Sequence, residues 1–273
     1  MTEQPTARRI LHCDVFAPRT GTGNPLAVIL DSEGLSTAQM QAIAKWNNLA
    51  ETTFILPPTH ADADYLVRIF TTQKEIAFAG HPSIGSAHAL IDAGLQAKQA
   101  GIIMQECLAG ILPIRHRPEE KNNSYSVRVP SSKWLHYAEQ ADAVFCKALP
   151  PHLWTALKPA LVEGGRRWWL AQLSDEQAVR GFTPDNYAIE ALAKATGSLG
   201  LCIFAKSNAA DADLVVRAFP LGVGIAEDPA SGAANAAIAA FLHETGHWPG
   251  TGDCYRVSQG REIGRDAVLS LEL

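Results

Sequence analysis

Two short segments of the sequence combine a titratable side chain with the start of a helix. Residues 78–87 read FAGHPSIGSA and residues 226–234 read AEDPASGAA, so both follow the pattern x-Pro-x-x-Gly-[Ser/Ala]-Ala, with His81 in the first and Asp228 in the second. The free N–H groups and the dipole of a helix N-terminus favour an anion. If the two helix starts converge, they would cradle a carboxylate. Both residues also have a structural interpretation, because Asp228 is a suitable N-cap and a histidine can simply pack at a helix entrance.

A third candidate is Glu51, which follows the letters NNLA and precedes the apolar segment TTFIL. A carboxyl group beside Phe54 and Ile55 is expected to have a pKa raised by desolvation, which suits a general acid or base. The alternative is an exposed glutamate in a turn, without a catalytic role.

The elements that must position these residues occur twice. Each half has a helix, two strands and then the x-Pro-x-x-Gly helix, predicted at residues 35–46, 52–56, 65–71 and 80–94, and again at 182–197, 199–205, 212–219 and 229–246. Arg68 and Arg217 are 149 residues apart in the sequence, and His81 and Asp228 are 147 apart. We interpret this register as an internal duplication. At the offset of 149 the counterpart of Glu51 is Gly200, so only the first half carries this carboxylate.

Composition limits the class of protein. The 273 residues are 47% hydrophobic and 19% charged, with a formal net charge of −5, which indicates a globular protein and argues against nucleic acid or an anionic membrane as the main partner. The sequence contains no apolar run that would serve as a signal peptide or a membrane span, so we expect a cytoplasmic location. Five widely spaced cysteines without a CxxC pair indicate reduced thiols, mostly buried.

Four segments together resemble the PhzF, or phenazine-biosynthesis-like, family: residues 14–58, 66–90, 227–236 (EDPASGAANA) and 257–265 (VSQGREIGR). The resemblance implies a diaminopimelate-epimerase-like α+β fold with two pseudo-symmetric domains, each a curved, mostly antiparallel, barrel-like sheet around a central helix, and with the active site between them. We expect an N-terminal domain at residues 1–129, to which the last strand at about 264–273 returns, and a C-terminal domain at 130–263.

The resemblance also implies roles for individual residues. Glu51 corresponds to the proton-transfer residue of the family, and His81 and Asp228 correspond to residues that line the same pocket. Backbone N–H groups around Gly85–Ser86 and Gly232–Ala233 are expected to hold the substrate carboxylate, and Gly80 and Ser231 complete the expected substrate-binding set. Related members commonly have serine where this chain has Ala233, which makes the phenazine precursor a poor default substrate.

These assignments predict an isomerase that abstracts a C–H proton and returns it to another carbon of a small carboxylic acid, with no cofactor and no metal. Epimerases of the same fold use two cysteines, whereas the matching positions here are His81 and Asp228. A homodimer is what the resemblance suggests. The family resemblance does not identify the substrate.

Two other functions compete with this interpretation. Residues 243–253, HETGHWPGTGD, match the zinc-hydrolase pattern H-E-x-x-H, with His243, His247 and Asp253 as ligands and Glu244 as base. However, Gly246 lies between the two histidines, where a helix would have to continue. The second alternative is a carboxylate-binding protein that keeps the fold without the reaction, in which Glu51→Gln would leave binding intact.

Overall fold

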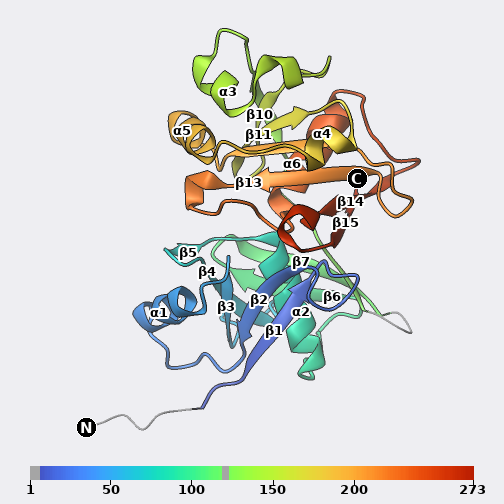
Figure 1. The fold of residues 1–273 in the computed structure, drawn as a ribbon. Helices are drawn as coiled ribbons and strands as arrows, with labels where there is room; N and C mark the ends of the chain where they lie inside the picture. Colours follow the sequence, from blue (N-terminus) through green and yellow to red (C-terminus); the bar gives the residue numbers. More distant parts are fainter. Residues whose placement is uncertain (1–6, 119–122) are drawn as a thin grey trace. The chain divides into compact units, whose positions relative to one another are not determined.

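The computed structural model describes residues 7–118 and 123–273 (Figure 1). Contacts between residues divide the chain into two compact units, each with a mixed β-sheet and its own helices. The first unit contains residues 1–15 and 25–128, and the second contains residues 16–24 and 129–273. In the described part of the chain, no helix has the length and apolar character needed to cross a membrane.

The first sheet has eight strands in the order β1-β2-β3-β4-β6-β7-β8, with β5 paired to β4. Its strands are β1 (Ile10–Val15), β2 (Asn24–Ile29), β3 (Thr52–Leu56), β4 (Tyr65–Phe70), β5 (Glu75–Ile76), β6 (Ile102–Cys107), β7 (Gly110–Arg117) and β8 (Ser124–Val127). Helix α1 (Thr37–Asn47) begins at the N-cap Ser36, which forms a capping box with Gln39. Helix α2 (Gly80–Asp92) contacts strands at both ends of the sheet, β1 and β8, so the sheet curves around it.

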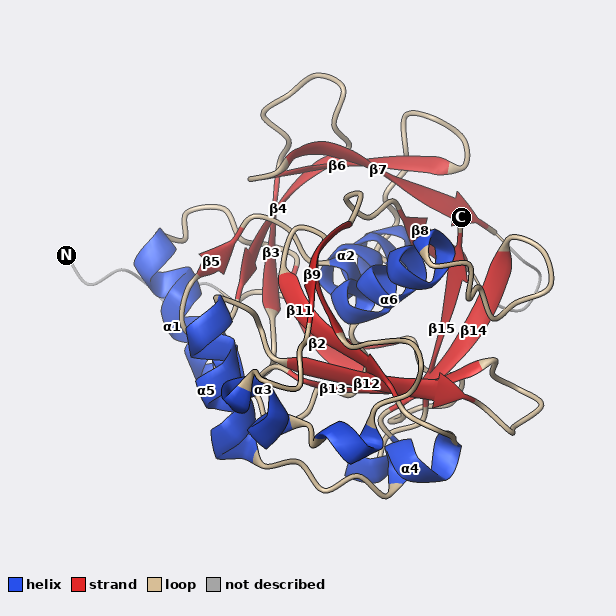
Figure 2. Ribbon diagram, turned by 90° about the horizontal axis from the view of Figure 1, so that it is seen from above, coloured by secondary structure: helices blue, strands red, loops and turns tan. Residues whose placement is uncertain are grey.

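The second sheet has seven strands in the order β15-β14-β13-β12-β11-β10-β9. Its strands are β9 (Lys133–Tyr137), β10 (Ala160–Glu163), β11 (Arg167–Gln172), β12 (Leu201–Lys206), β13 (Leu214–Phe219), β14 (Cys254–Gln259) and β15 (Ala267–Glu272). Helix α6 (Gly232–Glu244) contacts β9 and β15, the two outermost strands, so this sheet also curves around a helix. Figure 2 shows the strands in red and the two central helices, α2 and α6, in blue.

The remaining helices of the second unit are α3 (Ala143–Ala148), α4 (Glu176–Arg180) and α5 (Asn186–Thr196), with short 3₁₀ turns at Pro151–Leu153 (η1), Leu221–Val223 (η2) and Arg261–Ile263 (η3). These helices cover part of the sheet face that lies opposite to α6. Strand β11 shows most clearly that both faces of the sheet are buried. Trp168 packs in the cluster with α6, and the adjacent Trp169 packs in the cluster with α3 and α5. The two adjacent tryptophans are therefore buried on opposite faces of the same strand.

The duplication is confirmed by strand register. Phe54 is paired with Arg68 where β3 lies beside β4, and Ile203 is paired with Arg217 where β12 lies beside β13. Ile203 lies 149 positions after Phe54, and Arg217 lies 149 positions after Arg68. The next strand is parallel in both units, β6 beside β4 and β14 beside β13. The order of pairing is thus the same in the two halves.

The last strand differs from the sequence expectation. Strand β15 pairs antiparallel with β14 along its whole length, inside the second sheet, and does not return to the first. The repeat explains this pairing, because β7 pairs antiparallel with β6 in the first unit and β15 is its counterpart. The segment that joins the second unit is instead residues 16–24, where the Phe16 carbonyl accepts the Val268 N–H at 2.9 Å.

Candidate functional site

His81 lies in the first turn of α2. The helix begins at Gly80 after Ala79, whose side chain makes no cap, and Pro82 supplies no N–H group. The N–H groups of Gly80 and His81 therefore lie at the open end of the helix, where no intrahelical acceptor reaches them. The imidazole is 7% exposed, and burial lowers its pKa to about 3, so His81 is neutral at physiological pH.

Glu51 lies beside this histidine in the first unit. Helix α1 ends at Asn47 and is capped by Asn48 in the left-handed conformation (φ 53°). The Asn47 side chain donates to the Thr52 hydroxyl at 3.3 Å, at the start of β3. The intervening Glu51 places its Oε2 atom 3.6 Å from His81 Nδ1, with 17% of its side chain exposed. This separation is longer than a hydrogen bond, and catalytic contacts often tighten only when substrate binds.

The other ring nitrogen of His81 points to a ligand. Within residues 7–118 and 123–273, its buried Nε2 atom has no hydrogen-bond partner. A buried polar atom without a partner costs free energy unless a water molecule or a ligand satisfies it. The structure thus brings two of the three predicted catalytic residues together, and among the described residues Nε2 of His81 is left for a ligand or water.

Gly85 and Ser86, which we expected to hold the substrate carboxylate, have structural contacts. Both lie in the second turn of α2, where backbone N–H groups bond to carbonyls one turn earlier. A Cβ atom on Gly85 would lie 2.6 Å from Leu26 Cδ2, so glycine permits the close approach of helix and sheet. The Ser86 hydroxyl donates to Thr53 Oγ1 at 2.9 Å. In the first unit, the free N–H groups are instead one turn earlier, at Gly80 and His81.

The start of α6 agrees more closely with the expectation that backbone N–H groups at Gly232 and Ala233 are available to hold a carboxylate. Ser231 is the N-cap, and its hydroxyl accepts the Ala234 N–H at 3.3 Å. Gly232 and Ala233 are the first two helical residues, so their N–H groups lie at the open end of the helix and can meet an anion. Ser231 itself is committed to the fold, since its N–H donates to Gln259 Oε1 and its carbonyl accepts the Asn235 side chain.

Asp228 is not the helix cap, which corrects one interpretation of the sequence. Ser231 has that role, and Asp228 Oδ1 instead accepts the Asn24 side chain at 3.0 Å and the Ala230 N–H at 3.1 Å. Burial raises the pKa of Asp228 to about 6, although hydrogen bonds from Ala230, Ser231 and Asn24 act against the shift. The Asp228 carboxyl group therefore changes protonation near pH 6, a range that suits a general acid or base.

This raised pKa predicts a pH-dependent stability. The folded pKa of Asp228 lies above the unfolded value of 3.8, so the unfolding free energy falls as pH rises from about 4 to about 6. The shift corresponds to about 3 kcal/mol at 1.36 kcal/mol per pKa unit. We expect Asp228→Asn to become more stable relative to the wild type by about this amount between pH 4 and pH 7.

Urea unfolding of both proteins across this range measures the difference. The lowered pKa of His81 has the opposite effect, with stability lost as pH falls below about 6.5, but it is common to both proteins and cancels in the comparison. A difference that stays constant from pH 4 to pH 7 would show that Asp228 has an ordinary pKa.

Sequence reasoning missed two residues of this region, Asn24 and Gln259. Both are fully buried, and both contact the turn that carries Asp228. Gln259 Nε2 donates to the Asp228 carbonyl at 2.8 Å, while Asn24 donates to the Asp228 side chain and to the Ala230 carbonyl. Both residues lie in segments that carry the family resemblance. Nothing in the local sequence around either one indicates that it contacts Asp228, which is more than 30 positions away.

The H-E-x-x-H pattern does not form a zinc site. Helix α6 ends at Glu244 and Gly246 is left-handed (φ 72°), so His243 and His247 do not share one helical face. No group of three His, Cys, Asp or Glu side chains in the described residues is arranged to hold a metal ion. The exposed His243 ring instead contacts Trp248 edge-on, with ring centroids 6.3 Å apart.

We therefore expect His243→Ala to change turnover by less than about twofold, the range of an exposed substitution away from the reaction. Steady-state rates of wild type and variant, each with and without a chelator, provide the measurement. Loss of turnover in the variant or with the chelator would favour the zinc hydrolase instead.

Comparison with known proteins identifies the family. Residues 13–273 match the family described as phenazine biosynthesis-like protein, PhzC-PhzF. The chain belongs to the PhzF family. It is 33% identical over 264 residues to antisense-enhancing sequence 1 of Schizosaccharomyces pombe, a match that covers 95% of this chain and 88% of the yeast protein. It is 30% identical over 261 residues to trans-2,3-dihydro-3-hydroxyanthranilate isomerase of Pseudomonas aeruginosa, covering 96% and 88%.

Solved structures show the same fold. A PhzF-family phenazine biosynthesis protein of Bacillus anthracis superposes with a TM-score of 0.83 at 23% identity, over 96% of this chain and 88% of that one. A probable proline racemase from Agrobacterium radiobacter superposes with a TM-score of 0.61 at 16% identity, over 97% and 88%. The chain thus has the diaminopimelate-epimerase-like fold predicted from the sequence, and it is an isomerase of the PhzF family that acts on a small molecule.

Proposed function

We propose that this PhzF-family isomerase transfers a proton between two carbons of a small carboxylic acid, with Glu51 as the acid–base group. The observation that carries the proposal is the Glu51–His81 pair, a half-buried carboxyl group 3.6 Å from a buried, neutral imidazole. Groups with this combination of burial and a close titratable neighbour are candidates for proton transfer. The likeness to an isomerase over nearly the whole chain supports the same reaction class.

In the proposed reaction, the Glu51 carboxylate removes a proton from an acidic C–H group. The electron pair of that bond stays in the substrate as a double bond shifts, and Glu51 returns the proton to a second carbon. No group is oxidised or reduced, and no cofactor takes part. The N–H groups of Gly80 and His81 at the start of α2, next to Glu51, would stabilise the negative charge that develops on the substrate.

His81 and Asp228 have supporting roles in this proposal. The Nε2 atom of His81 is buried and unpartnered within the described residues, so it can hydrogen-bond a substrate hydroxyl or amino group. Asp228 changes its protonation near pH 6, so it can accept a proton from, or donate one to, a bound group at neutral pH.

The cysteines support a reaction without thiols. All five are free, but they are less buried than we expected, since two are buried, two are half-buried and Cys254 is exposed. Burial raises the pKa of Cys13, which lies against α2, to about 11, and raises the pKa of Cys202 well above its ordinary value. Thiols of this kind are poor bases at neutral pH because the thiolate is the reactive form.

The proposed substrate is a carboxylic acid that also carries an amino or hydroxyl group. The Pseudomonas aeruginosa relative is named for such a compound, trans-2,3-dihydro-3-hydroxyanthranilate. Ala233 offers no hydroxyl group at the start of α6, so the preferred acid need not be the same compound. The homodimer and the cytoplasmic location remain predictions from the sequence.

The test is a screen of wild-type protein against trans-2,3-dihydro-3-hydroxyanthranilate and a panel of small cyclic amino and hydroxy carboxylic acids. NMR spectra recorded over time would show conversion of one acid into another, and mass spectrometry would show that the product is an isomer of the same mass. Conversion that a chelator does not affect is the expected result. Binding of an acid without conversion of any would favour the carboxylate-binding alternative.

A further inference from the structure

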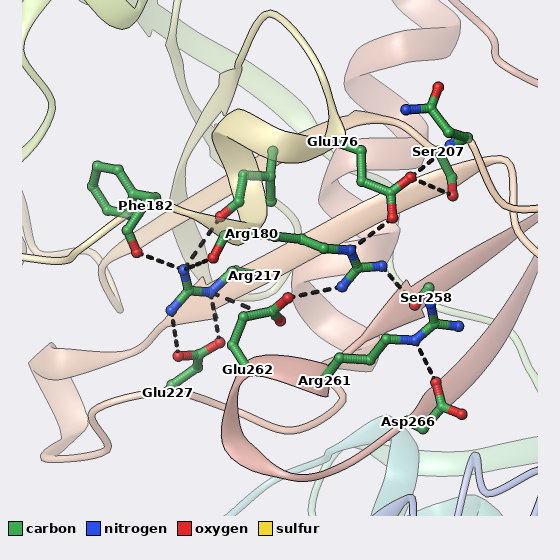
Figure 3. A network of polar contacts seen from close by, with 12 residues as sticks. Glu176, Arg180, Phe182, Ser207, Arg217, Glu227, Ser258, Arg261, Glu262 and Asp266 are labelled. Atoms are coloured by element: carbon green, nitrogen blue, oxygen red, sulfur yellow. Dashed lines mark hydrogen bonds and ion pairs between the residues drawn. The ribbon is translucent and has the colours of Figure 1, made fainter.

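A buried arginine lies next to the turn that carries Asp228. Arg217, on β13, donates from Nε and Nη2 to the two carboxylate oxygens of Glu227, both at 2.9 Å (Figure 3). The side chains of this pair are only 6% and 9% exposed. Two parallel hydrogen bonds fix the orientation of a carboxylate as well as its distance, which a lysine would not do. The pair is thus a rigid connection between β13 and Glu227.

The arginine is itself fixed from the other side. Its Nη1 donates to the carbonyls of Phe182 at 2.6 Å and Val179 at 3.2 Å, and its guanidinium carbon lies 5.0 Å from the centre of the Phe219 ring. Glu262 lies 4.0 Å from Arg217 Nε and accepts from Arg180 at 2.8 Å. Every part of the guanidinium therefore has a contact, and it has little freedom to move.

Glu227 immediately precedes Asp228 in the chain. The Asp228 N–H donates to the Ala218 carbonyl at 2.9 Å, and Ala218 follows Arg217 on β13. Strand β13 thus contacts the turn twice, through the backbone at Asp228 and through the ion pair at Glu227. A shift of about 1 Å in a reacting group can cost 10²-fold in rate, so such a connection matters to a proton-transfer residue.

We infer that Arg217 and Glu227 are positioning residues that hold the Asp228 carboxyl group in its working orientation. The inference rests on the proposed role of Asp228. Neither residue is assigned a part in the chemistry itself. Their effect reaches the reaction only through the turn at residues 227–231.

The first unit supplies an internal comparison. Arg68 and Glu75 form the equivalent bidentate pair, at 2.8 and 2.6 Å, and Arg68 lies over Phe70 as Arg217 lies over Phe219. However, Glu75 is six residues ahead of His81, whereas Glu227 adjoins Asp228. A bidentate arginine–glutamate pair therefore occurs in each unit, although only the arginines share the offset of 149 residues, and only Glu227 is joined directly to a candidate acid–base residue.

The experiment compares Glu227→Gln with Glu75→Gln. Each substitution keeps the size of the side chain but replaces one acceptor oxygen by a donor that faces the guanidinium, which breaks the bidentate pair. Amide hydrogen exchange of the free protein needs no substrate and reports the turn directly, through the Asp228 N–H. We expect Glu227→Gln to speed exchange at residues 225–231 about tenfold relative to the β12–β13 ladder, and Glu75→Gln to leave this segment unchanged.

Kinetics with an acid that the wild type converts form the second arm. A positioning role predicts that Glu227→Gln lowers kcat about tenfold with KM within about twofold, while Glu75→Gln changes neither. Unchanged exchange at residues 225–231, or acceleration spread evenly over the second sheet, would overturn the inference. Faster exchange with wild-type kcat would overturn it as well. If the wild type converts no acid, the proposed function fails, and the exchange comparison alone decides whether the pair positions the turn.

Discussion

Glu51→Gln is expected to lower the rate of proton transfer by about 10³-fold while the protein stays folded. Glutamine has nearly the shape of glutamate, but its amide cannot take up and return a proton. The side chain lies at the end of the turn between α1 and β3 and is not part of the buried core, so the substitution should hardly alter stability. Conversion rates followed by NMR, together with the thermal unfolding midpoint, measure the two effects separately.

The matched control is Glu190→Gln, on the exposed face of α5 beside Lys194, which should keep the wild-type rate. Calorimetric titration with the converted acid should still detect binding to Glu51→Gln, because the helix N-termini remain. Turnover in Glu51→Gln near the wild-type rate would remove Glu51 from the mechanism.

Gly200→Ala is expected to lower the unfolding free energy by about 3 kcal/mol or more, the range of substitutions that force a backbone clash. A Cβ atom on Gly200 would lie 2.0 Å from the Phe219 carbonyl oxygen, far inside van der Waals contact. The backbone there also has a φ of +149°, which residues with a side chain rarely adopt. Chemical unfolding at neutral pH gives the free energy.

Gly246→Ala separates the two causes. Gly246 also has a positive φ, +72°, but nothing lies within 4 Å of the position that a Cβ would take. We expect a loss of only about 1 kcal/mol for this control, from backbone strain alone. Equal losses in the two variants would show that the contact with Phe219 does not determine the effect.

Gly200 explains why the repeat carries Glu51 in its first half only. Gly200 occupies the position that corresponds to Glu51 at the offset of 149 residues. Because the chain approaches the Phe219 carbonyl so closely there, no side chain fits, and the second half has no equivalent carboxylate. The two halves thus keep the same strand register while only one carries the proposed proton-transfer residue.

Much of the fold could be predicted from the sequence because local patterns determine it. Apolar periodicity predicts α1, β3 and β4 within two residues of their observed bounds, and the shared offset of 149 residues indicates the repeat. The final strand was assigned to the wrong sheet, although the repeat itself implied that β15 pairs with β14 as β7 pairs with β6.

The site could be predicted only in part. Glu51 and His81 were expected to act together, and the structure places them side by side in the first unit. The surroundings of Asp228 depend on contacts that no local pattern encodes. Asn24 is 204 residues away in the chain and Gln259 is 31 residues away, yet both bond to the Asp228 residue. The alternative interpretation of Asp228 as the N-cap of α6 is wrong for a similar reason, because Asp228 and Ser231 are both good N-caps and tertiary contacts decide between them.

Solvent exchange in D₂O tests the central claim most directly. Wild-type protein and Glu51→Gln would be incubated with the acid that the wild type converts, and the deuterium content of each carbon followed by NMR. A carboxyl group that abstracts and returns a proton should introduce deuterium at the carbon that receives it, and the label should be absent with Glu51→Gln. Proton transfer by Glu51 would be contradicted if deuterium entered at the same rate with both proteins. It would also be contradicted if the acid were converted in D₂O without any label at carbon, under conditions where the Glu51 proton exchanges with solvent.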